Sequence, residues 1–251
     1  MSGPAATSNR WFVGGAPQST AALRLFCFPF AGGGASVYRG WGRDLPGVDV
    51  VAIQPPGRED RYGETAYTNL RTLTRDLSAA IEPWLDRPAV FFGHSMGGSI
   101  AHQLALDLQT RGRAPQLLII SARPAPHVPP DRKPIHALSD DGFVAELKKL
   151  EGTPAAVLEN RELMDFLLPT LRADFELCDT HVCDRAATLD TPLVLFGGLE
   201  DQTAGREKLE EWRGYTTGPV SVQMFPGNHF FLQTQKAAVL AAIQGALAPL
   251  R

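Results

Sequence analysis

The sequence lacks the features that mark secreted, disulfide-rich and membrane proteins. Its 251 residues include three cysteines, Cys27, Cys178 and Cys183, an odd number without metal-site spacing, so we expect thiols rather than a disulfide framework. No apolar run approaches the roughly 18 residues of a membrane span. The first residues lack the basic segment and apolar core of a signal peptide. We therefore expect a cytoplasmic protein.

A strong charge of either sign is also missing. The chain has 24 basic and 27 acidic residues, a formal net charge of −3, and no long basic block. This balance does not favour nucleic acid or an anionic membrane as a partner. Its histidines and carboxylates do not show metal-ligand spacing, so no metal or other cofactor is expected. With 44% hydrophobic residues the chain can form a substantial core, and we expect a monomer.

The chain contains instead a regular alternation of short apolar runs and helical patterns. Continuous apolar runs are typical of strands buried on both faces of a parallel sheet that helices cover. The alternation predicts an α/β fold with a mostly parallel, doubly wound sheet. The expected strands are residues 23–28, 48–53, 89–93, 116–121, 192–197 and 220–225, and the clearest helices are 69–85, 96–112 and 235–250.

One region, residues 122–190, interrupts this alternation because it contains no convincing strand. Ser139, followed by acidic residues and then by apolar positions such as Phe143 and Leu147, indicates the start of an amphipathic helix. We predict a single domain over residues 1–251 with a helical insertion in this region. The insertion is either extra packing for the core or a lid over the site. Long excursions at the ligand-binding edge of such sheets favour the lid.

The motif G-H-S-M-G, residues 93–97, lies where a predicted strand passes directly into a predicted helix. G-x-S-x-G in this context is typical of a nucleophile elbow, whose tight turn requires small residues and exposes the serine Oγ at the edge of the sheet. Amides at the helix start also point towards whatever bonds to that oxygen. A glycine-rich turn with an incidental serine is the alternative. The pattern predicts Ser95 as a nucleophile.

A serine nucleophile needs a base, and the base needs a residue that orients it. In α/β-hydrolases the chain order is serine, acid, histidine. His229 follows the last predicted strand and is the only histidine far downstream, so we predict it as the base. Asp201 is the predicted acid because it precedes a turn into a helix expected near Thr203. Glu200 remains the alternative.

An oxyanion hole requires two backbone donors. One is expected from Met96, the residue after the nucleophile, and the second from the loop that follows an early strand. The stretch P-F-A-G-G-G, residues 29–34, supplies such a loop, and Ala31 is preferred there over Phe30. Loss of one donor typically costs ~3 kcal/mol of transition-state stabilisation. A phosphate-binding loop is disfavoured because the lysine and spacing of such motifs are absent.

Five motifs together extend this interpretation from about Leu23 to the C-terminal helix. In this order and combination the chain resembles the type II thioesterases of polyketide synthases and nonribosomal peptide synthetases, whose relatives include medium-chain fatty-acyl thioesterases. The motifs are LFCFPFAGGGAS, VVAIQPPGREDR, FFGHSMGG, ELMDFLLPTLRADFELCDTH and FPGNHFFL.

The resemblance implies an α/β-hydrolase fold with a mobile helical lid. It also implies hydrolysis of acyl groups from the phosphopantetheine arm of an acyl- or peptidyl-carrier protein, which clears stalled or mis-primed synthases. Ser95, His229 and Asp201 would be the triad, and the amides of Ala31 and Met96 the oxyanion donors. The alternatives are an esterase or acyltransferase on small-molecule esters, a medium-chain fatty-acyl carrier-protein hydrolase, and a non-catalytic binding module.

Four basic residues, Arg58, Arg61, Lys148 and Lys149, have two interpretations. They could contact an acidic carrier domain or the phosphate of its arm, or they could be ordinary solvated charges. For the segment G-R-E-D-R, residues 57–61, we favour a structural loop that holds the site, with Arg58 paired to a carboxylate.

Overall fold

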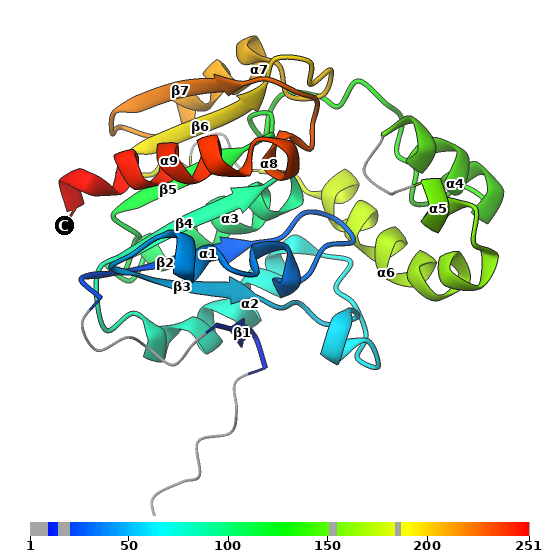
Figure 1. Ribbon diagram of the computed structural model, residues 1–251, viewed down its shortest axis with the longest axis horizontal. Coiled ribbons are helices and arrows are strands. Elements are labelled where there is room, and N and C mark those ends of the chain that lie inside the picture. Colours follow the sequence, from blue (N-terminus) through cyan, green and yellow to red (C-terminus); the bar gives the residue numbers. More distant parts are fainter. Residues whose placement is uncertain (1–9, 15–20, 151–154, 184–186, 251) are drawn as a thin grey trace, which may run out of the picture.

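The computed structural model describes residues 10–14, 21–150, 155–183 and 187–250. In these ranges one seven-stranded sheet has the order β1-β3-β2-β4-β5-β6-β7 (Figure 1). Only β1 runs antiparallel to its neighbour, so the predicted mostly parallel sheet is confirmed. The strands are β1 (Phe12–Val13), β2 (Leu23–Phe28), β3 (Val48–Ile53), β4 (Ala89–His94), β5 (Leu117–Ser121), β6 (Leu193–Gly198) and β7 (Val220–Phe225).

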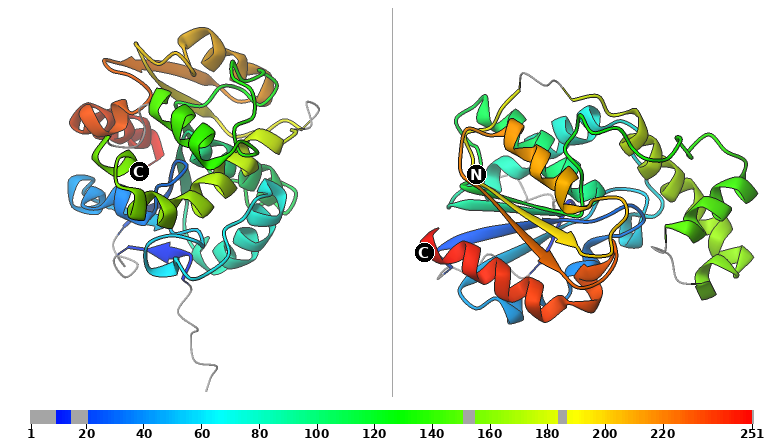
Figure 2. Two further views of the ribbon diagram at one scale, coloured as in Figure 1. Left: turned by 90° about the vertical axis from the view of Figure 1, so that its right-hand side faces the viewer. Right: turned by 90° about the horizontal axis from the view of Figure 1, so that it is seen from above.

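Helices cover both faces of the sheet and enclose two buried apolar clusters (Figure 2). One face packs against α2 (Leu70–Ile81), α3 (Met96–Gln109) and α7 (Arg206–Glu210). The other packs against α1 (Trp41–Asp44), α8 (Phe231–Thr234) and α9 (Lys236–Leu247). Within the described ranges the chain also forms the short 3₁₀ helices η1 (Ala35–Tyr38), η2 (Glu59–Arg61), η3 (Glu82–Trp84), η4 (Glu211–Tyr215) and η5 (Ala248–Leu250).

The sequence explains where α2 begins and which face it buries. Asn69 caps the helix because its side chain accepts a hydrogen bond from the Thr72 amide. Leu70, Leu73 and Leu77 then recur on one face and are buried. The predicted helix continued to residue 85, but the α-helix gives way to the 3₁₀ turn η3, which contains Pro83.

The region between β5 and β6 contains the predicted helices. They are α4 (Asp140–Lys149), α5 (Ala155–Leu158) and α6 (Arg161–Thr180), and they lie beyond the ends of the central strands (Figure 1). Ser139 caps α4, as predicted, by accepting a hydrogen bond from the Gly142 amide.

These helices have a separate apolar cluster, formed by Ile135, Phe143, Leu147, Met164, Leu168 and Leu171. We call the described part of residues 122–190 the insertion. Its role as a lid and the single-domain organisation of the chain both stay predictions. No helix in the described ranges is long and apolar enough to cross a membrane.

Candidate active site

The turn between β4 and α3 has the tight geometry that its glycines indicate. Ser95 has φ 53° and ψ −116°, a backbone conformation that a non-glycine residue rarely adopts. A Cβ atom at Gly93 would overlap the Gly97 backbone, and one at Gly97 would overlap the Phe28 carbonyl. The Ser95 amide donates to the Ser121 carbonyl at 2.8 Å, which ties the strained turn to β5.

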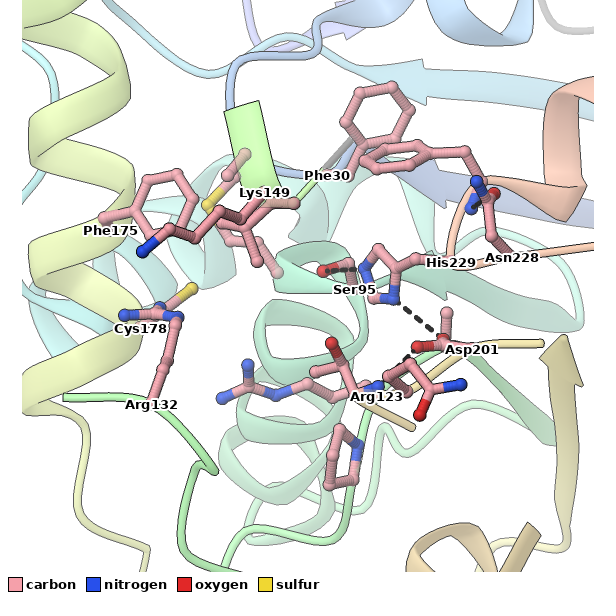
Figure 3. Close-up of a pocket in the computed structure, with 18 of the residues that line it drawn as sticks. Phe30, Ser95, Arg123, Arg132, Lys149, Phe175, Cys178, Asp201, Asn228 and His229 are labelled. Carbon is pink, nitrogen blue, oxygen red and sulfur yellow. Dashed lines mark hydrogen bonds and ion pairs between the residues drawn. The ribbon is translucent and has the colours of Figure 1, made fainter. Parts of the chain in front are cut away.

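Three side chains that are remote in sequence meet at this turn (Figure 3). His229 Nε2 lies 2.9 Å from Ser95 Oγ, and His229 Nδ1 lies 2.8 Å from Asp201 Oδ2. They come from the carboxyl ends of β4 and β6 and from the loop after β7. Asp201, and not the alternative Glu200, makes the contact with His229. The structure thus brings the three predicted residues together, while their catalytic role stays a prediction.

The carboxylate of Asp201 is ionised in this site. Burial alone raises its pKa, but the hydrogen bond and charge of His229 and the amides of Ala204 and Thr203 outweigh burial, so the pKa lies below its ordinary value. Those amides donate to Asp201 Oδ1 at 3.1 and 2.8 Å. An ionised Asp201 favours the tautomer of His229 with its proton on Nδ1, which leaves Nε2 free to accept the Ser95 proton.

A second histidine, His94, lies next to the His229 ring, with ring centroids 5.5 Å apart. It is fully buried, and its Nδ1 lies 2.9 Å from Ser121 Oγ. Burial first, and then the charge of His229, lower its pKa to about 3, so the ring is neutral at physiological pH. No motif in the sequence indicates that this ring contacts His229.

The two predicted oxyanion donors, Ala31 and Met96, line one pocket with Ser95. Met96 is the first residue of α3, where an amide has no acceptor within the helix. Neither amide donates a hydrogen bond within the part of the chain that the structure describes. Phe30 lines the same pocket, so the choice of the second donor stays a prediction.

The loop that carries Ala31 is fastened to the insertion by one buried ion pair. Arg58 donates to both carboxylate oxygens of Asp174, on α6, at 2.8 Å each, and to the Gly33 carbonyl at 3.1 Å. Asp174 Oδ2 also accepts from the Gly32 amide at 2.7 Å. The predicted pairing of Arg58 with a carboxylate is confirmed. Its partner was missed because the two residues lie 116 positions apart.

The other basic residues fall into two groups. Arg61 is buried and donates to Glu64 and to the Gln54 carbonyl, so neither it nor Arg58 is exposed to a carrier domain. Lys148 and Lys149 are exposed on α4, and Lys149 pairs with Glu146 at 2.6 Å. The carrier interpretation therefore remains available to the two lysines alone.

The pocket beside Ser95 has a volume of about 270 Å³ and lies between the edge of the sheet and the insertion. Its apolar wall comes largely from Leu147, Leu150, Leu171 and Phe175, all in the insertion. The same pocket holds the basic side chains Arg123, Arg132 and Lys149. Within the described ranges, no group of three or more histidine, cysteine or carboxylate side chains could hold a metal ion.

Residues 23–247 match the thioesterase domain family. The gramicidin S biosynthesis protein GrsT of Aneurinibacillus migulanus is 41% identical over 230 residues, covering 91% of this chain and 90% of that protein. Thioesterase PikA5 of Streptomyces venezuelae is 37% identical, with 91% and 82% covered. The solved type II thioesterase BorB from the borrelidin biosynthetic cluster has a TM-score of 0.85 at 30% identity, with 95% of this chain and 97% of that chain covered. The RedJ thioesterase of Streptomyces coelicolor has a TM-score of 0.84 at 37% identity, with 90% and 86% covered.

Proposed function

The chain belongs to the thioesterase domain family and is a thioester hydrolase of the α/β-hydrolase fold, and we propose that it releases acyl groups from carrier proteins. Its substrates are acyl thioesters on the phosphopantetheine arm of acyl- or peptidyl-carrier proteins. By removing them it clears stalled or mis-primed polyketide synthases and nonribosomal peptide synthetases. Relatives named as a gramicidin S biosynthesis protein, a probable cadicidin biosynthesis thioesterase and a thioesterase support this proposal. A cytoplasmic location and a monomeric state remain proposals that rest on the sequence.

Ser95, His229 and Asp201 perform the chemistry in two steps. Ser95 Oγ attacks the thioester carbonyl while His229 Nε2 takes its proton, and the oxyanion accepts hydrogen bonds from the amides of Ala31 and Met96. The carbon–sulfur bond breaks and the departing sulfur receives the proton from His229. Water then attacks the acyl-serine carbonyl and loses a proton to His229. The bond from the carbonyl carbon to Ser95 Oγ breaks, Oγ takes that proton from His229, and the free acid leaves.

The hydrogen-bonded row from Ser95 through His229 to Asp201 is the observation that carries this proposal. Its two contacts, 2.9 and 2.8 Å, already have the lengths that proton transfer requires. Asp201 is ionised and buried, so it stabilises the imidazolium that forms during attack. A non-catalytic binding module would not need this arrangement. A thiolate leaves readily, so selectivity must come from the pocket and from the carrier surface.

The direct test is a panel of acyl groups on one carrier protein, with product release read by mass spectrometry. We expect the wild type to hydrolyse carrier thioesters faster than small-molecule esters of the same acyl groups. Ser95→Ala should abolish hydrolysis and leave the thermal unfolding curve in place. A strong preference for the esters would favour an esterase, and retained turnover in Ser95→Ala would reject Ser95 as the nucleophile.

A further inference from the structure

The loop between β2 and η1 carries the proposed oxyanion donor Ala31 in a tight turn. The Gly33 amide donates to the Phe30 carbonyl at 2.9 Å and closes this turn. Gly32, inside the turn, has φ 77°, a left-handed conformation that favours glycine. The direction of the Ala31 amide therefore depends on how the chain is held before and after the turn.

The residues before the turn are fixed by the sheet and by α3. Phe28 pairs with Gly93 of β4, and its carbonyl accepts a hydrogen bond from Tyr38 Oη at 2.5 Å. A Cβ atom at Gly97 would overlap the Phe28 carbonyl, so the start of α3 packs directly on the end of β2. The element that carries Met96 and the strand that leads to Ala31 are thus in contact.

After the turn, Gln54 holds the Ala35 amide. Gln54 follows β3 and is fully buried; its Oε1 accepts from the Ala35 amide at 2.6 Å and its Nε2 donates to the Arg58 carbonyl at 3.0 Å. Its own amide donates to the Trp11 carbonyl at 2.7 Å, and its carbonyl accepts from Arg61 at 2.8 Å. Because every one of these polar groups is paired, the side chain cannot turn away without leaving a buried group unsatisfied.

Glu59 holds the next residue of the loop from a strained backbone. Its carboxylate accepts from the Ser36 amide at 3.2 Å and from Ser36 Oγ at 2.6 Å. Glu59 has φ 49°, which is rare for a residue with a side chain and persists only where the surrounding structure enforces it. A Cβ atom at Gly34 would overlap the Glu59 carboxylate and Gln54 Oε1, so glycine there leaves room for both side chains.

We propose that Gln54 and Glu59 are positioning residues, which hold the turn so that the Ala31 amide faces the oxyanion. This inference rests on the proposed thioesterase function, whose tetrahedral intermediate needs that donor. Ala35 and Ser36 begin η1, so their amides have no acceptor within that helix, and the two side chains supply one. Neither side chain lines the pocket, so both act through the backbone. A donor that is already oriented does not have to reorganise as the charge develops.

The test compares two inhibitors built on the same acyl chain, a trifluoromethyl ketone and a carboxamide. Ser95 Oγ adds to the ketone carbon, its proton passes to His229, and the ketone oxygen becomes an oxyanion, whereas the amide stays unchanged. The measured quantity is the ratio of the two inhibition constants, together with kcat and KM for an acyl-pantetheine thioester. A role in stability alone would not separate the two inhibitors.

Gln54→Met removes the acceptor and the donor while keeping the size of the side chain. We expect it to lower kcat by about tenfold to a hundredfold, the effect of a displacement of roughly 1 Å at a reacting group, and to change KM little. Binding of the ketone should weaken by a similar factor and binding of the amide hardly at all. Gln54→Glu keeps an acceptor for the Ala35 amide and should recover part of the loss.

The matched control is Gln103→Met, which makes the same change at a buried glutamine on α3. Gln103 donates to Asp107 at 2.9 Å and does not line the pocket. Its inhibitor ratio should equal that of the wild type. If Gln54→Met keeps the wild-type kcat, or weakens both inhibitors equally, the proposal is overturned while the thioesterase function stands.

Substitutions at Glu59 separate positioning from stability. Glu59→Gly loses the contacts to Ser36 but relieves the left-handed strain, so the denaturant midpoint should stay near that of the wild type. Its kcat should nevertheless fall by about tenfold. Glu59→Gln keeps an acceptor oxygen and should recover most of this loss. Asp60→Gly is the matched control, because it makes the same change in charge one residue later and keeps the Ser36 contacts.

The remaining outcomes are also decisive. If Gln54→Met does not fold, an unchanged kcat in Glu59→Gly overturns the proposal. If the wild type hydrolyses no thioester but binds the ketone more tightly than the amide, the proposed function fails, and the inhibitor ratios of the variants still decide the positioning role. If the wild type does not distinguish the two inhibitors, it has no working oxyanion hole and the positioning proposal is wrong.

Discussion

The edge of the sheet and the insertion position their residues by different means. At the edge, Ser95 directly follows β4, and Asp201 and His229 lie in the short loops after β6 and β7, so the hydrogen-bond ladder of neighbouring parallel strands brings the three residues to one side of the sheet. The insertion contains no strand of this sheet. Its backbone bonds to the body near its two ends, at Ala122, Ala125 and Leu189, whereas its helices have their own small apolar cluster and join the body through side chains. Backbone pairing therefore positions the proposed chemistry, whereas side-chain contacts shape the pocket.

The insertion is itself attached unevenly. Leu177, near the end of α6, is buried in the main core of the body, and Asp174 holds Arg58 one turn earlier. Thr170 Oγ1 donates to the Gly57 carbonyl. The first half of α6, around Met164, packs instead within the separate cluster of the insertion. A helix anchored at one end leaves its other end to be stabilised mainly by its local neighbours.

The largest expected effect comes from a substitution at the edge of the sheet. Asp201→Asn should lower kcat by about 10⁴, because an amide favours the wrong tautomer of His229 and cannot stabilise its charged form. Glu200→Gln is the matched control, since it changes the adjacent carboxylate in the same way. Steady-state kinetics on a carrier thioester measures both. A larger loss in Glu200→Gln than in Asp201→Asn would assign the acid to Glu200.

A second change breaks the link between the two regions. Asp174→Asn leaves the buried Arg58 without its counter-charge, which should reduce the free energy of unfolding by roughly 3 kcal/mol or more. It should also lower kcat, because Asp174 holds the Gly32 amide beside the proposed oxyanion donor. Chemical denaturation and steady-state kinetics measure the two effects. Asp165→Asn, an exposed position on the same helix, should change neither, and equal effects from both variants would refute the link.

A third pair of variants tests whether the main core and the insertion unfold separately. Phe91 in the main core and Phe143 in the insertion are both fully buried, and removal of either ring should cost about 3–5 kcal/mol of local packing. We expect Phe91→Ala to speed amide hydrogen exchange throughout the sheet. Phe143→Ala should speed it mainly in α4 and α6. Uniform acceleration by both variants would show that the two regions unfold as one unit.

Low pH should reduce the free energy of unfolding by a smaller amount than these substitutions. Burial lowers the pKa of His102 to about 3, so the folded state keeps this ring neutral while the unfolded chain binds a proton below its ordinary pKa of about 6.5. The stability this group contributes is therefore complete above about pH 6.5 and declines as the pH falls towards 3. At pH 5 the loss should be on the order of 1–2 kcal/mol.

His102→Phe removes this titration, since the ring contacts Trp212 and Tyr215 within an aromatic cluster. Denaturant melts at pH 7 and pH 5 should show a smaller difference for this variant than for the wild type. The matched control is His127→Phe, which alters a half-buried ring beside Tyr215. An unchanged pH difference in His102→Phe would contradict the expectation.

The sequence was a good guide at the edge of the sheet and a poorer one elsewhere. The six long strands agree with the predicted runs to within one residue at each end, and the residues that follow them could be named. The two-residue β1 carries too little pattern to be predicted. The helix expected near Thr203 begins instead at Arg206, because Asp201 accepts the amides of Thr203 and Ala204 in a turn.

The contacts of the insertion could not be predicted because they depend on how α6 docks. Residue spacing marks its apolar face, but no local pattern identifies Asp174 as the partner of Arg58. Helical periodicity reports burial, and it does not report which buried charge meets which.

The double use of Asp174 constrains any exchange of insertions between enzymes of this kind. Its carboxylate serves both the Arg58 fork and the Gly32 amide. A transplanted insertion with a new acyl preference must therefore place a carboxylate at the position of Asp174. A chimera without this carboxylate would leave the Arg58 guanidinium buried without a counter-charge. It would also free the loop that carries the proposed oxyanion donor Ala31, so altered specificity would be accompanied by slower turnover.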